Sequence, residues 1–157
     1  MPSMILNDIK VPNSILDGLR FLSSIKGCTH VTGLAGEHLK SSAAAARLPD
    51  WMFDKYTEFL NDSALMRENE NLKQLITEDD FDVYRGSKAC LCGPGRVDFT
   101  RVVVIAFNLG EDNFAALYKT GDAMSLIAMQ DTSEGLCWQE IYATPQEFFH
   151  DVGIPGY

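Results

Sequence analysis

The segment "RVVVIAFNL" at residues 101–109 limits the possible folds more than any other part of the chain. It is short, rich in β-branched residues and uncharged after Arg101, which is typical of a strand covered on both faces. We therefore predict that it forms a central strand of a sheet. Further strand-like runs follow it without a helical pattern between them: "NFAALYK" and "AMSLIAM" on either side of "TGD" at 120–122, and "LCWQEIYA" at 136–143.

The connections between these runs indicate how the strands are arranged. Gly121 in the "TGD" segment can adopt the positive φ that a tight hairpin turn requires. Strands that follow one another without helices between them predict an antiparallel meander rather than βαβ units. Two further short strands are predicted at 80–86 and 88–92.

The first half of the chain has helical periodicity. Residues 12–27, "PNSILDGLRFLSSIKG", carry apolar residues at helical spacing, with Asn13 or Ser14 as the expected N-cap and Gly27 as the expected end. The same reasoning predicts three more helices, at 35–48, 49–60 and 64–76.

The chain closes with the pattern of a short helix, "TPQEFFHDVG" at 144–153. Thr144 is the predicted N-cap, Pro145 the first helical residue, and Glu147 the partner of Thr144 in a capping box. Gly153 is the expected end of the helix. The residues predicted to be buried are Phe148, Phe149 and Val152.

This order of elements predicts an α+β fold in which N-terminal helices pack on one face of an antiparallel β-meander, with a short C-terminal helix. We expect a single domain over residues 1–157. Its helical part would cover about 1–78, and the sheet with the closing helix about 79–157.

The charge balance bears on the kind of partner that the chain can bind. Lys and Arg number 13 and Asp and Glu 22, which gives a formal net charge of −9. Such a chain repels the phosphate backbone of nucleic acids and attracts basic proteins. A stretch of about 20 apolar residues and a signal-peptide pattern are both missing, so we expect a cytoplasmic protein that does not enter membranes.

The cysteines are the residues to consider for metal or thiol chemistry. Cys90 and Cys92 lie in "CLCGPG", but zinc needs further ligands at suitable spacing, and Cys28 and Cys137 are far away. We therefore expect free thiols, no metal and no cofactor. A thiol hydrolase that pairs Cys90 or Cys92 with His150 is an alternative, although His150 also suits a helix C-terminus, where the dipole favours a cation.

Acidic residues near the expected hairpin are the candidate binding residues. Glu111 and Asp112 are neighbours in sequence, so their side chains would point apart rather than converge on one substrate bond or metal ion. An acidic rim that binds a basic protein is the better explanation. The candidate partner-binding residues are Glu111, Asp112, Asp122, Asp131 and Glu134.

Three segments together resemble the SUKH superfamily of Smi/Knr-like proteins, over roughly residues 35–153. They are "LPDWMFDKYTEFL" at 48–60, "NLGEDNFAALYKTGDAMSLIAM" at 108–129 and "CWQEIYATPQEFFHDVG" at 137–153. The chain departs from the family where an Asn-Gly-Gly turn is often found, because it reads "NDSALMRENE" there. The helix at 65–76 then resembles an insertion.

This resemblance implies a protein that binds rather than catalyses. Many members of the superfamily are immunity proteins, which bind a cognate secreted toxin and so protect the cell that makes it. We therefore expect a toxin-neutralising protein with a basic toxin domain as its partner. An acidic secretion chaperone for an effector protein is the main alternative, and a homodimer is left open.

Overall fold

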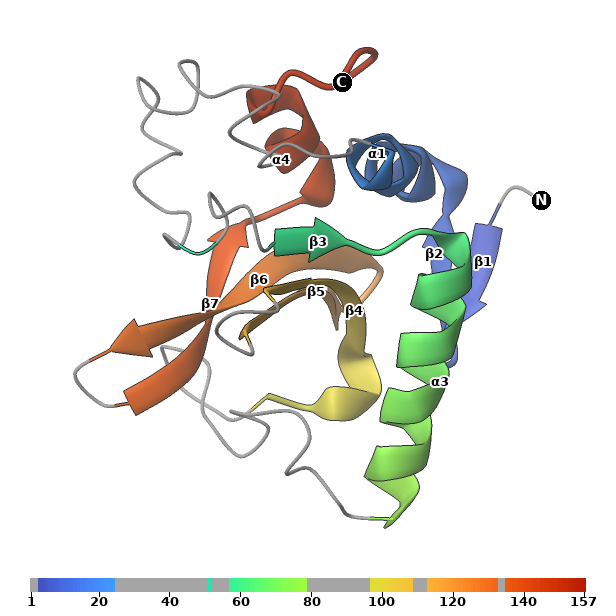
Figure 1. The fold of residues 1–157 in the computed structure, drawn as a ribbon, viewed down its shortest axis with the longest axis vertical. Helices are drawn as coiled ribbons and strands as arrows, with labels where there is room; N and C mark the ends of the chain where they lie inside the picture. The colour runs from blue at the N-terminus through green and yellow to red at the C-terminus, as the bar shows by residue number, and fades with distance from the viewer. Residues whose placement is uncertain (1–2, 25–50, 52–56, 79–96, 109–112, 133–134) are drawn as a thin grey trace.

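The computed structural model describes residues 3–24, 51, 57–78, 97–108, 113–132 and 135–157, with side chains left undescribed at 78, 130–132 and 135–137. Within these residues the chain forms three α-helices and two antiparallel sheets (Figure 1). The predicted α+β class is therefore confirmed, including the short helix that closes the chain.

The larger sheet has five strands, and four of them follow one another in both sequence and space, as predicted for a meander. The first of these four, β4, is buried from Val102 to Ala106 and has a strand on each side, which confirms the central strand. The strands lie in the order β3 (Thr57–Phe59), β4 (Val102–Asn108), β5 (Asn113–Thr120), β6 (Ala123–Thr132) and β7 (Gly135–Tyr142).

The turn between β5 and β6 is the hairpin that the "TGD" segment predicts. Thr120 pairs with Ala123, so Gly121 and Asp122 form a two-residue connection. Gly121 has a φ of 65°. A side chain at this φ would be strained, which explains glycine at this position.

The first half of the chain contains strands as well as helices, which corrects the prediction of a helical part over 1–78. β1 (Ser3–Leu6) and β2 (Ile9–Pro12) form a separate two-stranded sheet. Asn7 and Asp8 connect them with φ values of 52° and 61°. Two successive positive φ values favour a tight hairpin, and Asn and Asp tolerate them better than most residues.

The helix predicted at 49–60 is wrong over β3, which is a strand from Thr57 to Phe59. Thr57 and Phe59 are buried on either side of the exposed Glu58, and the three residues pair with β4. Backbone pairing with a long neighbouring strand outweighs the local helical spacing. Residues 52–56 of the same prediction lie outside the described residues.

Helix α1 (Asn13–Ser23) forms where it was predicted, but its N-cap is different. Pro12 occupies the cap position, and no side chain caps the helix there. The Asn13 side chain instead hydrogen-bonds Asp17 and Arg20. Helix α3 (Asp62–Glu78) extends the predicted 64–76 helix by two residues at each end, and the Asn61 side chain accepts a hydrogen bond from the N–H of Ala64.

Helix α4 (Pro145–Asp151) agrees with its predicted signals. The Thr144 hydroxyl accepts a hydrogen bond from the N–H of Glu147 at 3.3 Å, which confirms the cap. At the other end Gly153 has a φ of 83° and donates to the carbonyl of His150, while Ile154 donates to that of Phe149. This pair of bonds is a Schellman motif, the usual way a helix ends at glycine.

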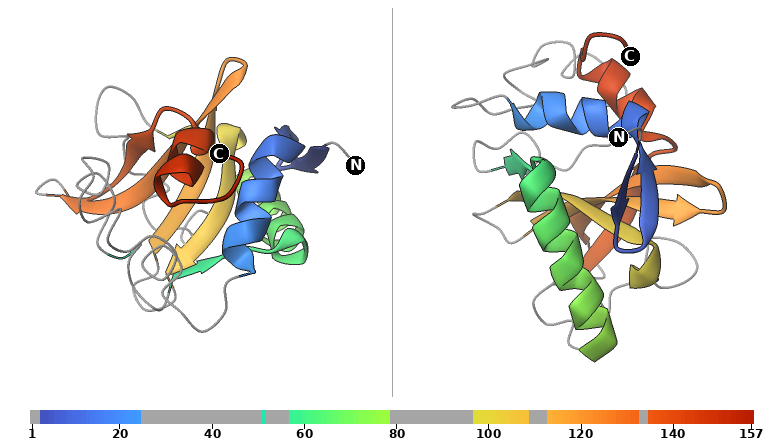
Figure 2. Two further views of the ribbon diagram at one scale, coloured as in Figure 1. Left: turned by 90° about the horizontal axis from the view of Figure 1, so that it is seen from above. Right: turned by 90° about the vertical axis from the view of Figure 1, so that its right-hand side faces the viewer.

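Helices α1 and α4 lie side by side over one face of the sheet (Figure 2). Phe148, Phe149 and Val152 of the closing segment are fully buried, as predicted. The Phe148 ring lies 6.2 Å from Phe59 of β3 and 5.5 Å from Tyr142 of β7, which joins both edges of the sheet to α4.

Helix α3 lies along the outer edge of β4. The side-chain amide of Asn69 donates to the carbonyl of Val104 at 2.9 Å and accepts from its N–H at 2.8 Å. At the start of β4, the side-chain amide of Asn7 donates to the carbonyl of Val102 and to that of Phe99, which precedes the strand. The side chains of Asn69 and Asn7 therefore occupy the part of this edge that β3 does not cover.

Several predictions fall outside the described residues. They are the helix at 35–48, the strands at 80–86 and 88–92, the helix stop at Gly27, and Cys28, Cys90 and Cys92. Among the helices that the structure describes, none is both long enough and apolar enough to span a bilayer.

Candidate binding surface

The charges of this chain are distributed unevenly along its sequence. From Gly121 to Tyr157 there is no lysine or arginine, so all 13 basic residues precede this segment. The segment folds into β6, β7 and α4, together with the turns around them. It contains six carboxylates: Asp122, Asp131, Glu134, Glu140, Glu147 and Asp151.

The described basic residues lie elsewhere, and most of them already contact an acidic or carbonyl group. Arg20 donates to Asp62 at 3.0 Å, and this hydrogen bond raises the pKa of Arg20 above its usual value. Lys73 contacts Asp8 at 2.9 Å, which likewise raises the pKa of Lys73. Arg101 donates to the backbone carbonyl of Lys119 at 2.6 Å and lies over the Tyr118 ring.

Unlike these basic residues, two of the carboxylates around β7 have no partner of opposite charge among the described residues. Glu140 and Glu147 are exposed, and neither forms a salt bridge with any residue in the described ranges. Asp151 accepts a hydrogen bond from the Tyr142 hydroxyl at 3.1 Å, which places its carboxylate next to β7. We call Glu140, Glu147 and Asp151 the β7 carboxylates.

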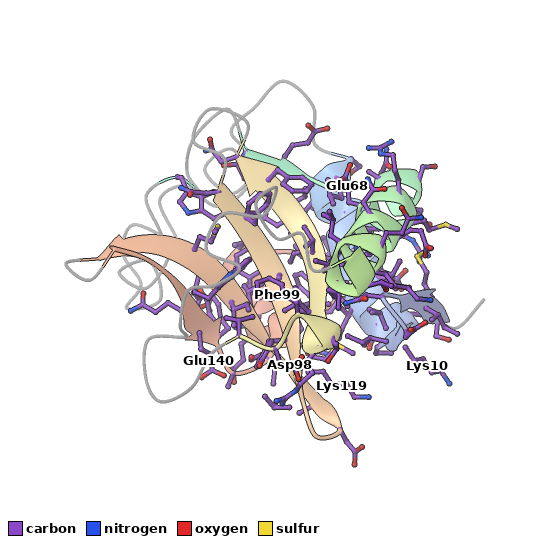
Figure 3. The ribbon with its side chains drawn as sticks, turned by 90° about the horizontal axis from the view of Figure 1, so that it is seen from below. Lys10, Glu68, Asp98, Phe99, Lys119 and Glu140 are labelled. Atoms are coloured by element: carbon purple, nitrogen blue, oxygen red, sulfur yellow. The ribbon has the colours of Figure 1, made fainter. Side chains whose placement is uncertain are left out.

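The β7 carboxylates lie on both sides of the strand. Glu140 pairs with Ile127, and Tyr142 pairs with Leu126, so the side chains of Glu140 and Tyr142 point to opposite faces of the sheet. Asp151 therefore lies with Tyr142 and α4 on one face and Glu140 on the other. Figure 3 shows Glu140 on the β7 side of the molecule, with Lys10 on the far side. A partner at β7 would meet negative charge from both faces.

The structure places two of the predicted binding residues, Asp122 and Asp131, and they lie at opposite ends of β6. Asp122 is exposed in the turn at one end of β5, whereas Asn113, which follows Asp112, pairs with Asn108 at the other end. Eight strand residues separate the two ends by about 26 Å at ~3.3 Å per residue. Asp131 lies opposite Leu136, also far from Asp122, and its side chain is not described. Glu111, Asp112 and Glu134 lie outside the described residues.

Sequence reasoning missed the β7 carboxylates because it considered acidic residues in loops. Glu140 lies in a strand, Glu147 in a helix, and Asp151 at the end of that helix. The absence of lysine and arginine after residue 120 was the signal that could have identified them.

The described residues provide no geometric support for the alternative of thiol chemistry. His150 lies in the last turn of α4, where its Nδ1 is 2.8 Å from the carbonyl oxygen of Tyr157. Cys90 and Cys92 lie outside the described residues, so their pairing with His150 stays a prediction. Within the described part of the chain, no three His, Cys, Asp or Glu side chains are grouped closely enough to hold a metal ion.

Comparison with known proteins finds no relative for this chain. No family model, no curated protein and no solved structure matches it.

Proposed function

We propose that this protein is a non-catalytic cytoplasmic binding protein that neutralises a basic protein toxin, in the manner of the SUKH-like immunity proteins that its sequence resembles. The observation that carries the proposal is the set of β7 carboxylates, of which Glu140 and Glu147 are exposed, in a segment of the chain, residues 121–157, whose sequence contains no lysine or arginine. A surface with one sign of charge attracts a basic partner over a distance and speeds their encounter.

A second feature supports binding over catalysis. The β7 carboxylates are distributed on both faces of a strand rather than directed at one point. Paired acid and base groups in an enzyme must act on the same substrate bond. Charges that surround a strand are better suited to a protein surface that meets another protein.

The test is co-expression with the toxin domain encoded by the neighbouring gene, followed by measurement of growth and of co-purification. We expect the native chain to restore growth, and the double variant Glu140→Lys/Glu147→Lys to bind the toxin at least tenfold more weakly at low salt. Glu70→Lys is the matched control, because Glu70 is also exposed but lies on α3. Equal neutralisation by the double variant and the control would contradict the proposed surface.

The chaperone alternative gives a different result in the same complex. A secretion chaperone wraps an unfolded segment of its effector, so limited proteolysis would leave a short protected peptide. An immunity protein binds a folded toxin domain, which would survive as a domain-sized fragment.

A further inference from the structure

We infer that the partner adds a strand to the sheet at the outer side of β7, and that the added segment is extended and basic. This inference rests on the proposed function and names the contact by which the partner is held. It arises from a difference between the two edges of the five-stranded sheet.

The outer side of β4 is closed, and the strand β3 that covers its end is only three residues long. β3 pairs with the end of β4, and Leu60 then donates its N–H to the carbonyl of Ile105. The side-chain amide of Asn69 hydrogen-bonds both the N–H and the carbonyl of Val104, and the side-chain amide of Asn7 donates to the carbonyl of Val102. A partner strand would find few unused backbone groups here.

The edge at β7 is different. β7 is the last strand of the sheet, and the described residues supply it with a strand partner on one side only, from β6. It contains neither lysine nor proline, two of the features that commonly prevent another strand from pairing with an edge, and its bulge lies at Ile141, near the end of the strand. Because no strand of the described residues pairs with the outer side of β7, an added strand can form a ladder there.

The β7 carboxylates determine which strand fits. Glu140 lies on one face of the edge, and Asp151 lies on the other. Side chains of an added strand alternate between the same two faces, so a Lys or Arg on the face of Glu140 would meet that carboxylate, and one that reaches past Glu140 on the other face would approach Asp151 beside Tyr142. A second copy of β7 would bring Glu140 close to another acidic edge, and this repulsion disfavours self-pairing.

The length of the contact follows from an irregularity in β7. The register shifts between Leu126 and Ile127, so Ile141 has no partner in β6 and bulges from the ladder. Regular pairing is therefore available from Gly135 to Glu140, which is six residues. A partner segment of six to eight residues would cover it.

The experiment uses a synthetic eight-residue peptide of alternating lysine and valine, blocked at both ends. An analogue with N-methyl groups on alternate residues carries the same charge but cannot form a ladder. We expect the unmodified peptide to bind at least tenfold more tightly than the analogue by calorimetry. We also expect it to slow hydrogen exchange at the backbone amides of residues 136–140.

Two variants separate charge from backbone pairing. Glu140→Lys should weaken binding of the peptide at least threefold, whereas Glu70→Lys on α3 should leave it unchanged. Equal binding of the peptide and its N-methyl analogue, or protection outside β7, would overturn the inference. Absence of binding by the unmodified peptide would overturn it as well.

Different results would contradict the strand addition and the proposed function. If the peptide does not pair with β7 but the co-expressed toxin is still neutralised, strand addition is wrong and the proposed function stands. If the peptide pairs with β7 but no toxin is neutralised, the edge is a binding site and the proposed function is wrong.

Discussion

The side-chain amide of Asn69 pairs with both backbone groups of Val104 in the way a neighbouring strand would. The other hydrogen of the Asn69 side-chain amide is donated to the carbonyl of Leu65, one turn earlier in α3. Asn69 is completely buried, and the described contacts use both of its donor hydrogens. One residue of a helix thus completes the edge of a sheet.

Replacement of Asn69 by alanine should lower the free energy of unfolding by about 2–4 kcal/mol. The substitution leaves the N–H and the carbonyl of Val104 buried without their partner, and unmet buried groups are costly. Urea denaturation measures the change. Asn71→Ala is the control, because Asn71 is exposed on the same helix. Equal effects of the two substitutions would show that Asn69 does not hold the edge.

Replacement of Gly18 by alanine should destabilise the protein by about 2 kcal/mol, although alanine favours helices by up to ~1 kcal/mol. A Cβ atom on Gly18 would lie 2.5 Å from the Phe149 ring, which is too close for any real contact. In a Phe149→Leu background the same substitution should cost at least ~1 kcal/mol less. A double-mutant cycle by thermal or urea denaturation tests this, and additive effects would contradict it.

The two tryptophans should respond differently to replacement by phenylalanine. The indole N–H of Trp51 donates to the carbonyl of Met129 at 2.8 Å, whereas Trp138 is buried and its N–H has no partner among the residues that the structure describes. Trp51→Phe loses a hydrogen bond and Trp138→Phe loses none. We expect Trp51→Phe to cost about 1–2 kcal/mol more. A Trp138→Phe variant that is the less stable of the two would show that this indole has a partner in solution.

Stability should decline in alkaline solution through Tyr157. Burial raises the pKa of its hydroxyl above the usual value near 10. The folded state thus holds this proton more tightly than the unfolded state. The stabilising effect is complete below pH ~10 and is lost as the pH rises through the higher folded pKa.

Denaturation of the native chain and of Tyr157→Phe between pH 8 and 11 measures this contribution. The hydroxyl donates to the carbonyl of Ser14, so the variant should be less stable at pH 8. The difference between the two proteins should shrink above pH 10. A constant difference across this range would mean that Tyr157 ionises equally in both states.

The elements that were predicted correctly carry their own local signals. β4 has a run of β-branched residues, the β5–β6 turn has a glycine at positive φ, and α4 has a threonine cap with a glycine end. Each of these signals acts within a few residues, so sequence alone is enough to detect it.

The elements that were missed depend on distant parts of the chain or on a signal that was overlooked. β3 is only three residues long and exists because β4 provides its backbone partner. The β1–β2 hairpin did have a local signal: Asn7 and Asp8, residue types that tolerate positive φ, lie between two short apolar segments. The β7 carboxylates were not predicted as binding residues, because the prediction considered acidic residues in loops whereas Glu140 and Glu147 lie within regular elements.

The contact between α1 and α4 has a consequence for how the chain acquires its structure during synthesis. Gly18 and Ser14 near the start contact Phe149 and Tyr157, and the bond between Ser14 and Tyr157 spans 143 positions of sequence. Helix α1 cannot bury its apolar side against α4 until residues 145–157 have emerged from the ribosome. Because closing long loops is slow, we expect the fold to be completed only after translation of this segment. Until then, the growing chain exposes Leu16 and Leu19, which the finished protein hides completely.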